Sequence, residues 1–239
     1  MKIAFLSDVH ISVDSPNRLN KFRKFIKTYA TSLDRLYLIG DIFDYWIGPG
    51  HLKLPDYREV IEMLRLASYN GLKIYLIYGN RDYLICDRFS RITGVTLLGS
   101  ESVIALNGHK VLLAHGDFIY NRNIRYTTYR RLMAFSIIRN IYTSLMPQVG
   151  KWVALRFRAI SKRDNEERYS SFGKDLITPT IEVFRNGYDV LICGHIHKPQ
   201  TISFTLNGRR CNVFVLGDWD DGCEYVEYCD GRFTLKPFA

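Results

Sequence analysis

Five short apolar runs set the framework of this chain, and each is followed at once by glycine or a polar residue. The runs are rich in Ile, Leu, Val and Tyr, as buried β-strands are, and cover 2–6, 35–39, 73–78, 110–114 and 189–193. Two segments with helical periodicity, 18–32 and 56–71, separate the first three, and Asn70-Gly71 provides a C-cap for the second. Alternating strands and helices predict a layered α/β fold.

The C-terminal part changes in character and completes the predicted architecture. Asn-Gly and Asp-Gly pairs, which favour hairpin turns, separate four short predicted strands, 201–206, 211–217, 223–229 and 232–236. We therefore predict an α/β, four-layer sandwich of two mixed β-sheets flanked by helices, with a helical insertion, or cap, after the fourth strand at about 121–170. Without repeats or a long polar linker, residues 1–239 are expected to form a single domain.

Composition indicates an intracellular setting. The five cysteines form no CxxC pair, so free thiols in a reducing compartment are expected. The N-terminus leads directly into the first strand and lacks the long apolar region of a signal peptide. The most apolar later stretch, 132–146, is too short to span a bilayer and contains Arg139. We expect a cytoplasmic protein.

The positive charge is concentrated in one segment. Between Asn121 and Arg163 there are ten Lys or Arg residues and no Asp or Glu, which leaves the rest of the chain at −1 against a net charge of +9. This segment is therefore a candidate site for an anionic partner.

Seven side chains that can bind metal follow the predicted strands. They lie in "SDVH", "GDIFDYW", "GNRDYL", "HGD" and "GHIH" and are Asp8, His10, Asp41, Asn80, His115, His195 and His197. Loops at the carboxyl ends of strands converge on one crevice. Oxygen and imidazole donors without thiolates suit manganese, with zinc or iron as alternatives. Seven ligands exceed one tetrahedral site but fit two ions that share a carboxylate and clamp a phosphoryl group.

Each motif also has an ordinary structural interpretation. "GD" and "GN" occur in many turns, Asp8 can cap a helix, and His115 can be a core histidine. Their recurrence at five successive strand exits favours a shared metal site. Glycine before Asp41, Asn80 and His195 would let the backbone come close to ions and substrate.

This order resembles the calcineurin-like metallophosphoesterases over most of the chain, whose pattern is D-x-H, G-D, G-N-H-[DE], H and G-H-x-H. The resemblance implies one ion on Asp8, His10, Asp41 and His197 and another on Asp41, Asn80, His115 and His195, with Asp41 bridging. The catalytic residues that it implies are Asp41, Asn80, Arg81 and His195.

Arg81 stands where most members have histidine. A guanidinium cannot act as a general acid near neutral pH, but it is a fixed fork for phosphate oxygens. We therefore expect Arg81 to stabilise charge and not to transfer a proton.

"GNRDYL", "GDIFDYWIG" and "HGD" are similar to one branch, the UDP-2,3-diacylglucosamine pyrophosphatases of lipid A synthesis, and the similarity extends to "LGDWDDG". It implies cleavage to UMP and 2,3-diacylglucosamine 1-phosphate with two divalent ions, foremost Mn²⁺. Asn123 replaces the branch's usual aspartate and Arg168 its usual lysine. The implied substrate contacts are Asn80, Arg81, Asn123, Ser161, Asn165, Arg168 and His195.

The basic segment suits a lipid substrate. Its apolar residues recur every three or four positions from Tyr126 to Leu145, and a second amphipathic piece begins at Lys151. Such a helical pair could hold acyl chains and contact anionic headgroups, which predicts peripheral association with the cytoplasmic face of the inner membrane. The alternative is a hairpin that only packs on the sandwich.

Two other functions compete with this one. A two-metal phosphodiesterase acting on nucleic acid or nucleotides would use the basic segment to track phosphates. Its aromatics alternate with Ile, Leu and Met at helical spacing, so no nucleic-acid partner is expected. A binding scaffold with an inactive site would lack ligands, whereas all seven are present.

Overall fold

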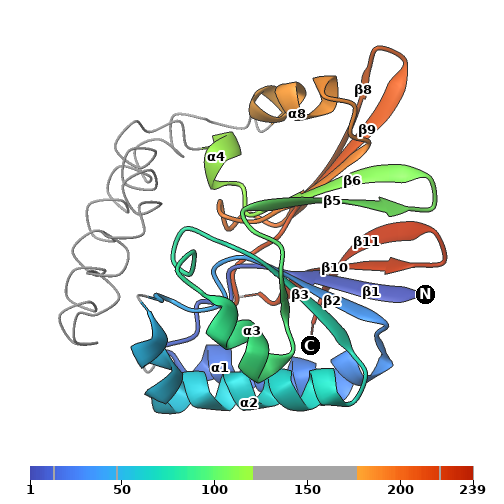
Figure 1. Cartoon of the computed structure of the whole chain (residues 1–239). Helices are drawn as coiled ribbons and strands as arrows, with labels where there is room; N and C mark the ends of the chain where they lie inside the picture. Colours follow the sequence, from blue (N-terminus) through green and yellow to red (C-terminus); the bar gives the residue numbers. More distant parts are fainter. Residues whose placement is uncertain (13, 47, 121–176, 221, 239) are drawn as a thin grey trace.

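The computed structural model describes residues 1–12, 14–46, 48–120, 177–220 and 222–238. The predicted insertion at about 121–170 lies outside these residues, and so do four of the predicted substrate contacts, Asn123, Ser161, Asn165 and Arg168. The described chain forms two β-sheets with helices on the outer face of each (Figure 1).

The first sheet has six strands in the order β11-β10-β1-β2-β3-β4. Strands β1 to β4 are parallel, and β10 and β11 are antiparallel additions at one edge. The strands are β1 (Lys2–Leu6), β2 (Arg35–Ile39), β3 (Lys73–Ile77), β4 (Thr96–Leu97), β10 (Glu224–Cys229) and β11 (Arg232–Pro237). The predicted strands 2–6 and 35–39 are confirmed, and the one predicted at 73–78 ends one residue earlier.

The second sheet has five strands in the order β5-β6-β7-β9-β8. Strands β6, β7 and β9 are parallel, whereas β5 and β8 are antiparallel edges. The strands are β5 (Glu101–Leu106), β6 (His109–Ala114), β7 (Val190–Cys193), β8 (Gln200–Leu206) and β9 (Arg209–Val215). Strand β5 was not predicted, because one face of this edge strand is exposed and the segment begins with Glu101 and Ser102.

Two of the three predicted hairpin turns are confirmed. Asn207-Gly208 joins β8 to β9 and Asp230-Gly231 joins β10 to β11, each pair with two positive φ angles as in a type I′ turn. The hairpin predicted at Asp221-Gly222 is wrong, because β9 and β10 belong to different sheets. The dipeptide favours a turn but does not specify which sheet receives the next strand.

Three longer helices cover the outer face of the six-stranded sheet (Figure 1), namely α1 (Pro16–Lys24), α2 (Pro55–Tyr69) and α3 (Asp87–Thr93). The helix predicted over 18–32 begins at Pro16 and continues from Lys24 as a π turn, Phe25–Tyr29, and a 3-10 turn, Ala30–Ser32. Two short helices, α4 (Asp117–Tyr120) and α8 (Ile181–Arg185), lie on the outer face of the five-stranded sheet. Further 3-10 turns cover Pro49–Lys53 and Thr178–Thr180.

The core divides into three layers because successive residues of a strand point to opposite faces. In β1, Ile3 and Phe5 pack between the sheets, whereas Ala4 and Leu6 pack against the helices. In β7, alternate residues likewise separate the inter-sheet layer from the layer beneath α8. The predicted sandwich of two mixed sheets flanked by helices is confirmed.

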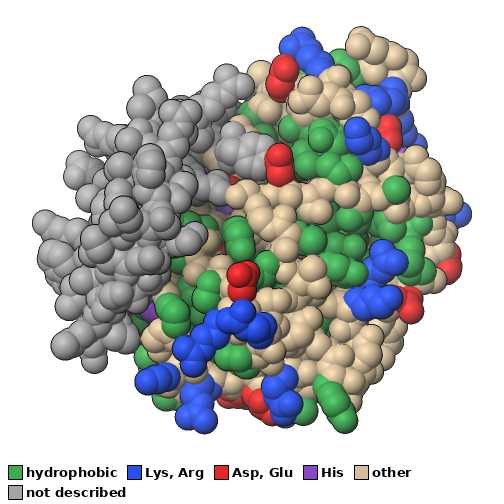
Figure 2. Space-filling model, in the orientation of Figure 1, with side chains coloured by type: hydrophobic (Ala, Val, Ile, Leu, Met, Phe, Trp, Pro, Cys, Tyr) green, Lys and Arg blue, Asp and Glu red, His purple; other side chains and the backbone are tan. Residues whose placement is uncertain are grey.

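On the surface, Lys and Arg side chains gather at the lower edge of the face in Figure 2, where Figure 1 places α1 and α2, with single acidic side chains among them. In the part of the chain that the structure describes, every helix is too short or too polar to cross a bilayer.

Candidate metal centre

The seven predicted ligands lie just past the carboxyl ends of five parallel strands, β1, β2, β3, β6 and β7. The strands come from both sheets, and hydrogen bonds join the sheets at this point. The His195 N–H donates to Asp8 Oδ2 at 2.9 Å, and His115 Nδ1 donates to the Ile39 carbonyl at 3.0 Å. The loops that leave β1, β2 and β3 lie on the side away from the N-terminus (Figure 1).

The backbone at these positions adopts the left-handed region, which is unfavourable for residues other than glycine. Asp8, His10, Asp41, His195 and His197 all have φ between 52° and 74°. The other non-glycine residues with positive φ in the described chain occupy hairpin turns, at Asn107, Asn207 and Asp230. Strain of order 1–3 kcal/mol per residue at one place is typical of a functional site.

Two glycines are required by close packing against the carboxylates. A Cβ on Gly79 would lie 2.1 Å from Asp41 Oδ1, and one on Gly194 would lie 2.1 Å from Asp8 Oδ2. The backbone before Asn80 and His195 therefore lies against the two carboxylates, and its predicted approach to ions and substrate stays a prediction.

Asp8, His10 and His197 form a first compact group. Asp8 Oδ1 lies 3.2 Å from His197 Nε2 and 3.6 Å from His10 Nε2, and the two imidazole nitrogens are 3.2 Å apart. One ligand atom from each residue can be chosen so that all lie within 4.8 Å of one another.

Asp8, Asp41 and His115 form a second group, which meets the same 4.8 Å limit. Asn80 Oδ1 extends it, at 3.0 Å from His115 Nε2 and 3.2 Å from His195 Nδ1. Asp8 belongs to both groups, whereas the resemblance implies a bridging Asp41, so the identity of the bridge stays a prediction. All seven predicted ligands meet in one place.

These residues fit two divalent ions. His10 Nδ1 is buried and makes no hydrogen bond to the described residues. A buried polar atom without a partner costs about 1–3 kcal/mol, and coordination would remove that cost. The donors are oxygen and nitrogen atoms without a thiolate, which suits manganese, zinc or iron.

Burial and neighbouring charges lower the pKa of two of the four imidazoles and raise the pKa of the other two. Burial lowers the pKa of His10 well below its usual value, with help from Arg81, and lowers that of His195 to about 3, with help from His115. For His197, burial is outweighed by Asp218 and Asp8, which raise the pKa to about 10. For His115, Asp41 and Asp8 likewise overcome burial and raise the pKa. Of the four imidazoles, His115 and His197 are therefore the two that hold a proton more strongly than an ordinary histidine.

The two carboxylates differ as well. Burial raises the pKa of Asp41 to about 7, although His115 and Arg81 oppose the rise. Burial would also raise the pKa of Asp8, but His115 and His197 hold it below its usual range.

Metal binding is expected to release protons, because ligands coordinate in their deprotonated forms. His115 and His197 have raised pKa values, and Asp41 has a pKa of about 7, so an ion must displace protons from the two imidazoles and, below about pH 7, from Asp41 as well. The apparent affinity for Mn²⁺ should therefore rise between pH 6 and pH 8. Calorimetric titrations in buffers of different ionisation enthalpy measure the released protons. A binding heat that is independent of the buffer would contradict this assignment.

Arg81 lies beside the predicted ligands and is fixed by two carboxylates. Its backbone N–H donates to Asp41 Oδ1 at 2.9 Å, and its Nε lies 3.3 Å from Asp41 Oδ2. Its Nη1 donates to Asp44 Oδ1 at 2.5 Å. The side chain remains 21% exposed, so the guanidinium is held in place and still accessible to a substrate.

Three carboxylates around the ligands were not among the predicted site residues. Asp44 holds Arg81, and Asp218 Oδ2 lies 3.4 Å from His197 Nδ1. Asp82, fully buried, accepts the N–H groups of Ile42 and Gly79 at 2.8 Å each and so ties two ligand loops together. The available signal was an aspartate in each of the motifs "GDIFD", "GNRD" and "GDWDD" that was not counted among the ligands.

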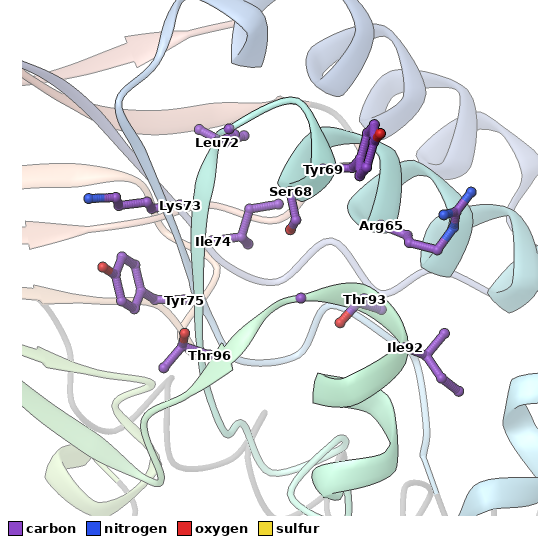
Figure 3. Close-up of a pocket in the computed structure, with 12 residues that line it drawn as sticks. Arg65, Ser68, Tyr69, Leu72, Lys73, Ile74, Tyr75, Ile92, Thr93 and Thr96 are labelled. Atoms are coloured by element: carbon purple, nitrogen blue, oxygen red, sulfur yellow. The ribbon is translucent and has the colours of Figure 1, made fainter.

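A hollow of about 540 Å³ lies at the other end of β3, where that strand begins. Figure 3 shows side chains of α2, β3 and α3 around it, among them Arg65, Tyr69, Lys73 and Ile92. It contains none of the predicted ligands and is separate from the metal centre.

The chain is similar to a known protein family, to named relatives and to solved structures. The model of the calcineurin-like phosphoesterase family matches residues 1–199. A UDP-2,3-diacylglucosamine hydrolase of Coxiella burnetii (strain Dugway 5J108-111) is 36% identical over 98% of this chain and 96% of its own length. A protein of that name from Ectopseudomonas mendocina (strain ymp) is 36% identical, with 99% and 98% covered. A solved archaeal phosphodiesterase is 14% identical, with 100% of both chains covered and a TM-score of 0.48.

Proposed function

The chain belongs to the calcineurin-like phosphoesterase family, and we propose that it is a two-metal hydrolase of UDP-2,3-diacylglucosamine that yields UMP and 2,3-diacylglucosamine 1-phosphate. The observation that carries the proposal is the convergence of seven oxygen and imidazole ligands in two adjoining groups. Relatives that carry the hydrolase name match almost the full chain.

Two ions bound by these residues would supply Lewis-acid stabilisation of phosphoryl charge and a nucleophile at neutral pH. Asp41 holds Arg81 through both its backbone and its side chain, so the guanidinium is fixed before substrate arrives. Arg81 would donate to phosphoryl oxygens, where a positioned donor stabilises the charge that develops. Asn80 Oδ1 faces His115 and His195, which leaves the amide nitrogen of Asn80 to donate to the substrate.

The remaining parts of the proposal concern metal identity and the lipid. We assign Mn²⁺ to the site, one of the ions that suit its oxygen and imidazole donors. We assign recognition of the diacylglucosamine to Asn123, Ser161, Asn165 and Arg168, within a cap at about 121–170 of a single domain over 1–239. The ten cationic side chains between Asn121 and Arg163 support a cytoplasmic enzyme held at the inner face of the membrane.

The test is turnover of UDP-2,3-diacylglucosamine by manganese-loaded protein, with products identified by mass. We expect UMP and the diacylated sugar phosphate in equal amounts. Cleavage of a simple phosphodiester or of single-stranded nucleic acid by the same sample, without turnover of the lipid, would retain the two-metal chemistry and overturn the proposed substrate.

A further inference from the structure

The segment after β9 contacts the metal centre through a residue that is not among the seven ligands. Asp218 Oδ2 lies 3.4 Å from His197 Nδ1. The other nitrogen of that ring, Nε2, lies 3.2 Å from both Asp8 Oδ1 and His10 Nε2. Asp218 and the ligand group therefore contact opposite nitrogens of one imidazole.

This arrangement has a specific consequence for coordination. An imidazole binds metal through a nitrogen that carries no proton, and a hydrogen bond from its other nitrogen fixes both the tautomer and the rotation of the ring. In His115, Nδ1 donates to the Ile39 carbonyl, which directs Nε2 toward Asp41. In His197, the Asp218 carboxylate lies in the corresponding place, 3.4 Å from Nδ1.

Polar side chains of α1 hold the segment that carries Asp218. Lys21 Nζ donates to the carbonyls of Trp219 at 3.1 Å, Asp220 at 2.6 Å and Gly222 at 3.5 Å. Arg18 binds both carboxylate oxygens of Asp220, with Nε at 2.6 Å from Oδ1. A third nitrogen of Arg18, Nη1, donates to the His10 carbonyl at 3.4 Å.

Apolar contacts complete the same attachment. Trp219 is fully buried, and its ring centroid lies 6.1 Å from that of Phe22 and 5.9 Å from that of Phe25. Arg18, Lys21, Phe22 and Phe25 follow the i, i+3, i+4, i+7 spacing of one helix face. One face of α1 and its continuation therefore fixes the backbone of His10 and the segment that carries Asp218.

We propose that Asp218 is a positioning residue for His197, and that α1 holds it in place through Arg18 and Lys21. The inference rests on the proposed metal centre and concerns one of its two ions, the one bound by the group that contains His197.

Calorimetric titration with Mn²⁺ tests the proposal in the full chain. In Asp218→Ala, one of the two binding events should weaken about 10–100-fold, the usual effect of losing such a partner, while the other keeps its affinity. Asp218→Asn should weaken it less, because the amide oxygen still accepts a hydrogen bond. Lys21→Met should weaken the same event. The control is Glu59→Gln, which removes the ion pair between Arg23 of α1 and Glu59 of α2. This pair does not involve the segment that carries Asp218, so neither binding event should change.

Zinc-loaded protein labelled with ¹⁵N-histidine gives a second readout. The Nδ1 proton of His197 should be slow to exchange in the wild type and should exchange rapidly in Asp218→Ala. Unchanged affinities in Asp218→Ala, or equal weakening of both events with a lower melting temperature, would overturn the inference. A wild type that binds no Mn²⁺ would instead overturn the proposed function.

Discussion

Asp41→Asn should lower kcat/KM by about 10³-fold or more, because correctly bound ions supply several kcal/mol of transition-state stabilisation. Asp41 is 2% exposed, and its Oδ2 lies 3.3 Å from Arg81 Nε and 3.6 Å from His115 Nε2. An amide at this position has no charge and places an NH₂ group against a cation or an imidazole. The measurement is turnover of UDP-2,3-diacylglucosamine together with the bound metal per chain.

A matched control is Asp34→Asn, which alters an exposed carboxylate that accepts the Lys2 N–H. It should retain full turnover and metal content. If Asp41→Asn kept both ions and turned over within tenfold of the wild type, Asp41 would not be the shared ligand that the resemblance implies.

Arg81→Lys should lower kcat by about 10²–10³-fold, the usual cost of removing a fixed donor to developing charge. Lysine keeps the charge but loses the planar fork, which Asp41 and Asp44 hold in the wild type. Steady-state kinetics of the variant separate kcat from KM. Added guanidinium should restore part of the turnover of Arg81→Ala, whereas ammonium should not.

Arg58→Lys provides the comparison, since Arg58 is an exposed arginine of α2. Its kinetics should match those of the wild type. Full kcat in Arg81→Lys would show that positive charge alone suffices at this position and that the planar fork of the guanidinium is not needed.

The metal centre was predictable because its ligands follow the strands in order. A strand that is followed by "SDVH" or "GHIH" brings these polar residues to the carboxyl edge whatever the details of packing. Glycine before Asn80 and His195 likewise has a local cause, the backbone approach to Asp41 and Asp8. Short-range patterns of this kind are sufficient to predict the alternation of strands and helices and the place of the site.

What the sequence did not reveal depends on contacts between distant segments. Asp218 reaches His197 only because β9 lies beside β7 in the second sheet. Helix α1 is distant in sequence from the segment that it holds, since Arg18 and Asp220 are 202 residues apart. The chain also passes from the second sheet to the first between β9 and β10, and this change of sheet depends on contacts with distant strands. Edge strand β5 was not predicted, because its exposed face interrupts the apolar pattern of the segment.

The most direct test of the two-metal account is UMP release from UDP-2,3-diacylglucosamine measured against the number of Mn²⁺ ions bound per chain. Chelator-stripped protein should be inactive, and turnover should appear as occupancy rises toward two ions and reach its maximum there. Full turnover in the stripped protein, or no turnover at two ions per chain, would contradict the account.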